Sequence, residues 1–159
     1  MLKKRFWKVF MGLLAVLSIL APLSPQHRII VWETGQQQLL YFWGGHSALG
    51  ATVSSLAYLL GTFMGAIAAF LMIWGYRKLS RENPRAIALF NWAALCIAIE
   101  LIFLLGIAEE ILTDLRAQNL HADSYASWGG GISEFLLIAL LFVPGWVKKA
   151  YFSKLEPRA

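Results

Sequence analysis

The sequence predicts an all-α integral membrane protein, a four-transmembrane-helix bundle whose N and C termini are both cytoplasmic. Its 159 residues are 58% apolar and the mean hydropathy is +0.60, which is unusual for a water-soluble domain. Lys and Arg gather in three short clusters, with long apolar stretches between them. Because basic residues mark the cytoplasmic side, the chain must cross the bilayer twice between successive clusters. The clusters are Lys3, Lys4, Arg5 and Lys8; Arg77, Lys78, Arg81 and Arg85; and Lys148, Lys149, Lys154 and Arg158.

The whole chain, residues 1–159, is expected to form one membrane domain, and its first span covers residues 6–23. This span follows the first basic cluster and stops where Pro22 and Pro25 disfavour a helix. A basic start followed by an apolar stretch also resembles a cleaved secretory signal. The residues around Pro22 lack a small-x-small cleavage site, so we expect an uncleaved span. Cleavage would leave three spans and would not change the sidedness downstream.

The first outer loop, residues 24–46, contains two stretches that favour β-structure. Residues 28–32 and 39–43 could pair as a hairpin, with Thr34 and Gly35 turning the chain between them. In the alternative, residues 39–43 lie flat on the membrane, with their aromatic side chains at headgroup depth. The sequence leaves both interpretations open.

Small residues recur along the second span, residues 47–76, at every third or fourth position. They therefore share one helical face, and such a face lets another backbone approach closely, as in small-xxx-small helix pairs. The neighbour is either another helix of the same bundle or a second chain, in a homodimer or with a partner membrane protein. The stripe consists of Gly50, Ser54, Ala57, Gly61, Gly65 and Ala68.

The third span, residues 86–108, follows an inner loop at residues 77–85. Pro84 is expected at the start of the third helix, where a missing backbone N–H costs nothing. Apolar residues keep their helical spacing beyond the span, into the second outer loop at residues 109–130. We therefore expect this helix to continue outside the membrane.

The fourth span, residues 131–147, leads to a cytoplasmic tail at residues 148–159. It follows three glycines, residues 129–131, which form either a hinge or a tight entry into the helix. Aromatic residues near the span ends match the interfacial belts of membrane proteins. They are Trp7, Trp74, Tyr76 and Trp146 on the inner side, and Trp32, Trp43, Tyr125 and Trp128 on the outer side.

This four-span layout resembles that of claudin-like proteins, whose first external loop forms a small sheet. The resemblance is one of topology alone. The loop of that family is longer and carries a Trp-based motif followed by two cysteines, whereas residues 24–46 contain no cysteine.

Glu100 is the strongest candidate for a functional residue, because it lies inside the third span. It precedes Glu109 by nine residues, which is about 13 Å along a helix. An ionised carboxylate at the bilayer centre costs about 2.5 to 3.5 kcal/mol or more, so Glu100 should face the bundle interior or a wet cavity. It could exchange protons or bind a cation during transport, or it could hydrogen-bond a neighbouring helix in a structural role.

Glu134 lies near the outer end of the fourth span, where it could reach water or pair with His46. His27, His46 and His121 are weak candidates for metal ligands, together with the acids of the outer loops. They lack the spacing of known metal motifs, and none lies mid-span where a haem would need it. The single cysteine, Cys96, provides no disulfide or thiolate pair. We therefore expect no cofactor, and the metal question stays open.

No catalytic template is recognisable in the sequence. The formal charge of +5 comes from anchoring clusters rather than one basic face, which argues against nucleic-acid binding. We expect a small non-enzymatic accessory, assembly or interaction subunit in the lipid bilayer. The alternatives are a proton- or cation-coupled transporter that uses Glu100, and a membrane enzyme or metal-handling protein that uses outer acids and histidines. Compact loops and a signal-like amino terminus favour the bacterial inner (plasma) membrane.

Overall fold

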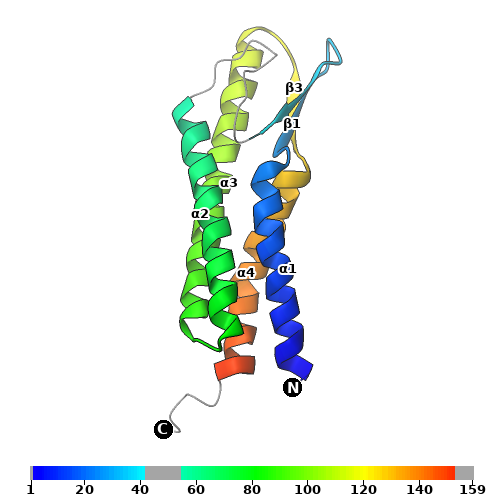
Figure 1. Ribbon diagram of the computed structural model, residues 1–159. Helices are drawn as coiled ribbons and strands as arrows, with labels where there is room; N and C mark the ends of the chain where they lie inside the picture. The colour runs from blue at the N-terminus through cyan, green and yellow to red at the C-terminus, as the bar shows by residue number, and fades with distance from the viewer. Residues whose placement is uncertain (1, 42–54, 153–159) are drawn as a thin grey trace.

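Four long helices lie side by side, and three short strands form a small sheet at one end of them (Figure 1). The computed structural model describes residues 2–41 and 55–152. We call the end that carries the strands the sheet end, and the opposite end the basic end. The elements are, in chain order, α1 (Leu2–Leu23), β1 (His27–Val31), β2 (Gln37–Leu40), α2 (Ser55–Ser80), α3 (Arg85–Ala117), β3 (Ala122–Ala126) and α4 (Trp128–Phe152).

All four helices are long and apolar enough to cross a membrane, as in a multi-pass membrane protein. Their outward faces are apolar as well: Phe63, Trp92 and Leu141 are each more than half exposed. The expectation of four such helices is confirmed. The expected all-α fold is confirmed only in part, because the chain between helices also forms a small three-stranded sheet. The helices also extend past the expected spans. The predicted start of the second span, residues 47–54, lies outside the described residues.

Inside the bundle, apolar side chains from Ala to Phe fill the space between the helices. Met11 and Leu14 of α1, Met72 of α2 and Phe90 of α3 are fully buried in one core. The first helix is therefore an integral part of the packing, with contacts to both α2 and α4. Because interiors are packed at close to crystal density, this core fixes the helix positions.

The helix α3 connects the bundle to the sheet. Its 33 residues extend over about 50 Å, whereas the hydrocarbon core of a bilayer is about 30 Å thick. The helix continues past residue 108, as expected. Its last turns carry apolar side chains, and the sheet covers them. This second core contains Ile107, Ile111, Leu112 and Leu115 of α3, and Ile29, Val31, Leu40 and Ala122 of the strands.

The sheet is antiparallel, with strand order β2-β1-β3. Of the two interpretations that the sequence left open for the first loop, the structure shows the hairpin, with Arg28 paired to Leu39. Its strands cover residues 27–31 and 37–40 rather than 28–32 and 39–43. Gly35 lies in the turn at φ 65°, a backbone conformation that glycine adopts without strain. Leu39 and Leu40 belong to β2 rather than to a segment on the membrane surface. Residues 42 and 43 lie outside the described residues. The third strand, from the second loop, was not predicted.

The sheet end is joined to the bundle by direct backbone contacts between residues 24–26 and the start of α4. Gly129 N–H donates to the Pro25 carbonyl (2.8 Å), and Ser127 N–H donates to the Gln26 carbonyl (2.8 Å). A Cβ atom at Gly130 would lie 2.5 Å from the Gln26 carbonyl oxygen. The three glycines lie in the first turn of α4. Gly129 and Gly130 leave no room for a side chain, so they form the tight entry into the helix rather than a hinge. We call these contacts the glycine junction.

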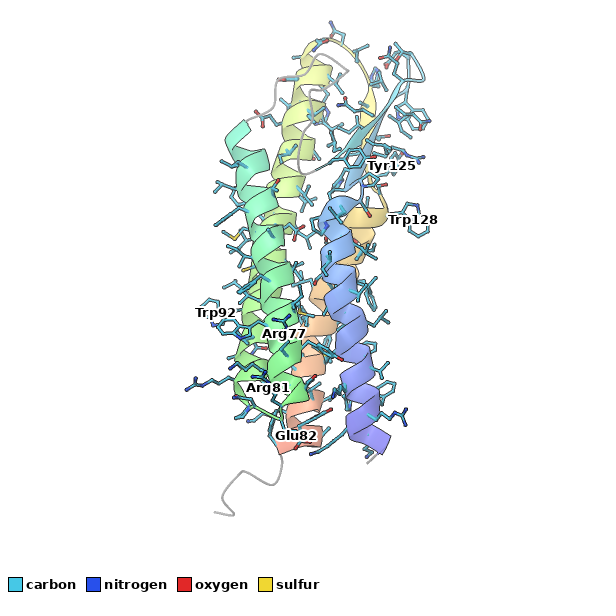
Figure 2. The ribbon with its side chains drawn as sticks, viewed as in Figure 1. Arg77, Arg81, Glu82, Trp92, Tyr125 and Trp128 are labelled. Atoms are coloured by element: carbon cyan, nitrogen blue, oxygen red, sulfur yellow. The ribbon has the colours of Figure 1, made fainter. Side chains whose placement is uncertain are left out.

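At the basic end, the start of α1, the α2–α3 connection and the end of α4 meet. Lys4 forms a salt bridge with Glu82 (2.9 Å), and the Tyr151 hydroxyl donates to the Lys4 carbonyl (2.6 Å). Figure 2 shows Arg77, Arg81 and Glu82 near this end. Pro84 directly precedes α3, as expected. The described members of all three basic clusters thus lie at the same end of the molecule.

The glycine junction predicts opposite outcomes for two adjacent substitutions. Gly130→Ala should destabilise the fold by about 1–3 kcal/mol, because its Cβ would overlap a backbone oxygen that cannot easily move. Gly131→Ala is the matched control, since a Cβ there meets nothing within 4 Å and alanine favours the helix. Thermal unfolding in detergent measures both, and equal midpoint shifts would contradict the role of the junction.

Candidate functional site

Glu100 lies in the interior of the bundle, on the face of α3 that packs against α2. Its side chain is 2% exposed. A Cβ atom at Gly65 would lie 3.1 Å from Glu100 Oε1 and 3.2 Å from its carboxyl carbon. The missing side chain of Gly65 therefore makes the room that the carboxyl group occupies. The two strongest sequence candidates, the membrane acid and the small-residue stripe, meet at this point.

One oxygen of the Glu100 carboxyl group is not satisfied by its surroundings. This Oε1 atom is buried and has no hydrogen-bond partner within the described part of the chain. Buried polar atoms normally have a partner, because an unmade hydrogen bond costs about 1–3 kcal/mol. An oxygen of this kind can accept a hydrogen bond from water, bind a cation or exchange a proton. Among the described residues, Glu100 is the only acidic or basic side chain in the middle of the bundle.

The small-residue stripe of α2 faces inward over its described length. Gly61, Gly65 and Ala68 are buried, and Gly65 packs against α3 of the same chain. Gly50 and Ser54 lie outside the described residues, as does the side chain of Ala57. Sequence reasoning missed Gly75, where a Cβ would lie 2.6 Å from the Phe90 ring. Gly75 lies seven residues, or about two helical turns, after Ala68, so it shares the face of the stripe. The same spacing that predicted the stripe could therefore have included Gly75.

Glu134 and His27 lie close enough to interact at the sheet end. His27 begins β1, is buried, and its Nδ1 is 3.1 Å from Ser124 Oγ of β3. Burial lowers the pKa of His27 below its ordinary value of 6.5, and the negative charge of Glu134 offsets part of that shift. Glu134 itself is exposed on α4. Its expected partner, His46, lies outside the described residues.

His121 and Glu33 contact each other at the end of the sheet that lies away from His27. Both Glu33 carboxylate oxygens accept the His121 backbone N–H, at 2.9 and 3.0 Å, and His121 Nδ1 contacts Glu33 Oε1. These hydrogen bonds, led by the backbone one, lower the pKa of the Glu33 carboxyl group. The pair joins the β1–β2 turn to the start of β3, so both residues have a structural role.

The two histidines that the structure describes, His27 and His121, lie at opposite ends of the sheet. His27 pairs with Ala126 at one end of the β1–β3 ladder, whereas His121 adjoins Ala122, which pairs with Val31 at the other end. Four residues of strand separate these ends, or about 14 Å. Within residues 2–41 and 55–152, no three His, Cys, Asp or Glu side chains are grouped as metal ligands. His46 lies outside these ranges.

A second feature, which the sequence did not predict, is a cleft of about 850 Å³ between the outward face of the sheet and the start of α4. Aromatic side chains surround it: Trp128 is 82% exposed, Trp32 57% and Tyr125 46%. Tyr125 and Trp128 project from the same side of the molecule (Figure 2). We call it the aromatic cleft. Its lining comprises Arg28, Ile30, Trp32, Tyr125, Ala126, Ser127, Trp128, Gly131, Ile132 and Phe135.

Strand register explains how these side chains reach the same surface. Alternate residues of a strand point to opposite faces, so Ile29 and Val31 are buried against α3 while Arg28 and Trp32 face outward. Tyr125 lies directly opposite Arg28 in the ladder. The indole N–H of Trp32 donates to Asp123 (2.9 Å), which holds the ring on the outward face.

No protein-family model matches this chain, and no curated protein matches it either.

The buried His27 predicts a loss of stability in acid. The folded pKa lies below the unfolded value, so the unfolded chain binds a proton first as the pH falls. The stabilising contribution is therefore complete above pH 6.5, and it declines as the pH falls from there to the lowered folded pKa. His27→Gln should flatten the dependence of the thermal midpoint on pH between 7.5 and 5.

The exposed Gln37→Ala variant is the control and should keep the wild-type pH dependence, because it removes no titratable group. A His27→Gln variant with the wild-type slope would show that another group dominates the acid response.

Proposed function

We propose that this chain is a multi-pass protein of the bacterial inner membrane, with four spans and both termini in the cytoplasm. The gathering of the basic clusters at one end supports this orientation, because Lys and Arg are retained on the cytoplasmic side. Glu33, Asp123 and Glu134 all belong to the opposite end, which would then face outward. Compact loops and the signal-like start of α1 favour the bacterial assignment.

We further propose that the protein is a non-enzymatic accessory or assembly subunit that binds a partner membrane protein through the aromatic cleft. The exposure of Trp32, Tyr125 and Trp128 around that cleft carries this proposal. Trp, Tyr and Arg are the residue types that contribute most to binding energy at protein interfaces. Interfacial lipid contact accounts for a Trp beside a helix end, such as Trp128. Trp32 was also expected in the outer aromatic belt, but it follows β1 in the hairpin that extends beyond α1 (Figure 1). We therefore assign Trp32 to the partner interface instead of to lipid.

The chemistry of the cleft indicates what the partner presents. Arg28 is exposed on the cleft and forms no salt bridge within the described residues. A partner carboxylate could pair with its guanidinium group in a bidentate geometry. Ile132 and Phe135 extend the lining along α4. An apolar side chain of the partner would pack against them, next to the ion pair with Arg28. The expected partner thus offers an acidic residue next to an apolar one, just outside the membrane.

Photo-crosslinking in intact membranes tests this interface. A photoreactive residue at position 125 or 128 should give one discrete protein adduct, and Arg28→Glu should abolish it by charge reversal. Position 92 is the matched control, because Trp92 is similarly exposed but projects from the other side of the bundle (Figure 2). Lipid adducts alone at all three positions would refute the proposed interface.

One observation supports a second candidate function, a proton- or cation-coupled transporter that uses Glu100, with Glu134 at the outer mouth. It is the buried Oε1 atom of Glu100 that lacks a hydrogen-bond partner. The 2% exposure of the same side chain weighs against this candidate, since a carrier group must meet water from at least one side. The accessory role requires no such access, and we therefore prefer it.

Glu100→Gln separates the two functions, because glutamine keeps the shape and the hydrogen-bonding capacity but cannot carry a proton. In an accessory subunit, the variant should fold with an unchanged thermal midpoint and keep its crosslinked partner. In proteoliposomes under a potassium diffusion potential, wild type and variant should show the same proton flux by a trapped pH dye. A flux in wild type that Glu100→Gln abolishes would establish transport instead.

A further inference from the structure

A second cleft lies at the basic end, between the start of α1 and the end of α4, and the proposed function does not use it. It has a volume of about 600 Å³. Its lining consists of Lys3, Phe6, Trp7, Trp146, Lys149 and Ala150. Two cations and three aromatic rings, with no acidic residue among them, line a space between two neighbouring helices.

The aromatic part of this cleft is built by contact between the two helices. The rings of Trp7 and Trp146 have centroids 5.7 Å apart and are tilted by 41°. Phe6 packs edge-on against Trp7 at 5.0 Å, yet it is 58% exposed, and Trp146 is 53% exposed. In a bilayer, Trp side chains at a helix end lie at the depth of the headgroups. The exposed ring faces then meet the upper part of the acyl chains.

The charges of this cleft are available for an anion. Lys3 and Lys149 are exposed, and neither forms a salt bridge within the described residues. The neighbouring Lys4, in contrast, is paired with Glu82. Lysine places its ammonium group at the membrane surface while its methylene stem lies along apolar groups. An anion at the mouth of the cleft would therefore meet two cations above an aromatic wall.

We propose that this cleft binds one anionic glycerophospholipid of the inner leaflet. The phosphate lies between the ammonium groups of Lys3 and Lys149, and an acyl chain lies against Phe6 and Trp146. Basic pockets between transmembrane helices on the cytoplasmic side have this chemistry. The inference depends on the membrane orientation proposed above, but not on the aromatic cleft or its partner. The bound lipid would join α1 to α4 at the end of the bundle opposite the glycine junction.

Native mass spectrometry of the detergent-solubilised protein, titrated with phosphatidylglycerol or phosphatidylethanolamine of the same acyl chains, tests this site. Wild type should bind one phosphatidylglycerol at least fivefold more tightly than phosphatidylethanolamine. Each lysine near an anionic headgroup contributes about fivefold in affinity. The Lys3→Gln/Lys149→Gln variant should therefore lose about 25-fold in affinity for phosphatidylglycerol and retain little preference between the two lipids.

The Lys8→Gln/Lys148→Gln variant is the matched control, because it removes the same charge from the same two helices outside the cleft. It should keep the affinity for phosphatidylglycerol within about twofold of wild type. Equal losses in both variants would overturn the proposal, since they would indicate diffuse surface attraction. Displacement of the lipid by soluble glycerol phosphate would also overturn it, because the aromatic wall would then contribute nothing.

Two further outcomes complete the test. Phe6→Ala should weaken both lipids, because it removes part of the acyl-chain contact while keeping both lysines. A dimer of the chain in place of a lipid adduct, lost when Lys3 and Lys149 are replaced, would assign the cleft to a second copy and overturn the lipid proposal. Thermal midpoints within a few degrees of wild type would show that each variant is folded. Failure of this site would leave the crosslinking result at the aromatic cleft unaffected.

Discussion

The glycine junction is the constraint on which the arrangement of the sheet end depends. Residues 24–26 leave α1, enter the sheet and touch the first turn of α4, all within three positions. Gln26 is fully buried there: its amide group donates to the carbonyls of Ala21 and Ser24, while its backbone N–H donates to Leu40. One residue therefore connects the end of α1, strand β2 and Ser127, the residue directly before α4. Only a glycine surface on α4 allows the backbones to approach this closely, and the position of the sheet relative to the bundle follows from it.

The helices could be predicted from the sequence because the bilayer imposes a simple rule. A span needs a long apolar segment, and charged residues stay at its ends, so local composition is sufficient. The continuation of α3 was predictable for a related reason, since Ile111, Leu112 and Leu115 keep one helical face. The hairpin was also within reach, because both of its strands and the turn at Gly35 lie close together in sequence. The sequence left open whether residues 39 and 40 would pair or lie on the membrane, and the apolar end of α3 decides this by burying Leu40.

The third strand could not be predicted, because its partner is far away in the chain. Residues 122–126 contain only one strongly β-favouring residue, Tyr125, and they become a strand because β1 offers an unpaired edge beside them. The aromatic cleft depends on this pairing and was missed for the same reason. Glu100 was found because a carboxyl group in an apolar span is conspicuous by itself. That it would lie against Gly65 required knowledge of how α2 and α3 pack, which neither segment specifies alone.

The continuity of α3 has a mechanical consequence. One unbroken helix carries Phe90 in the central core, Glu100 in the middle of the bundle and Leu115 beneath the sheet. A helix of this length behaves as a stiff rod, because bending it sharply would require a proline or an interruption of its hydrogen bonds. A load applied to the sheet would therefore tilt the whole rod about its packed middle rather than deform it locally. The carboxyl group of Glu100 lies near that pivot, where tilting displaces side chains least, so its close packing against Gly65 would be retained.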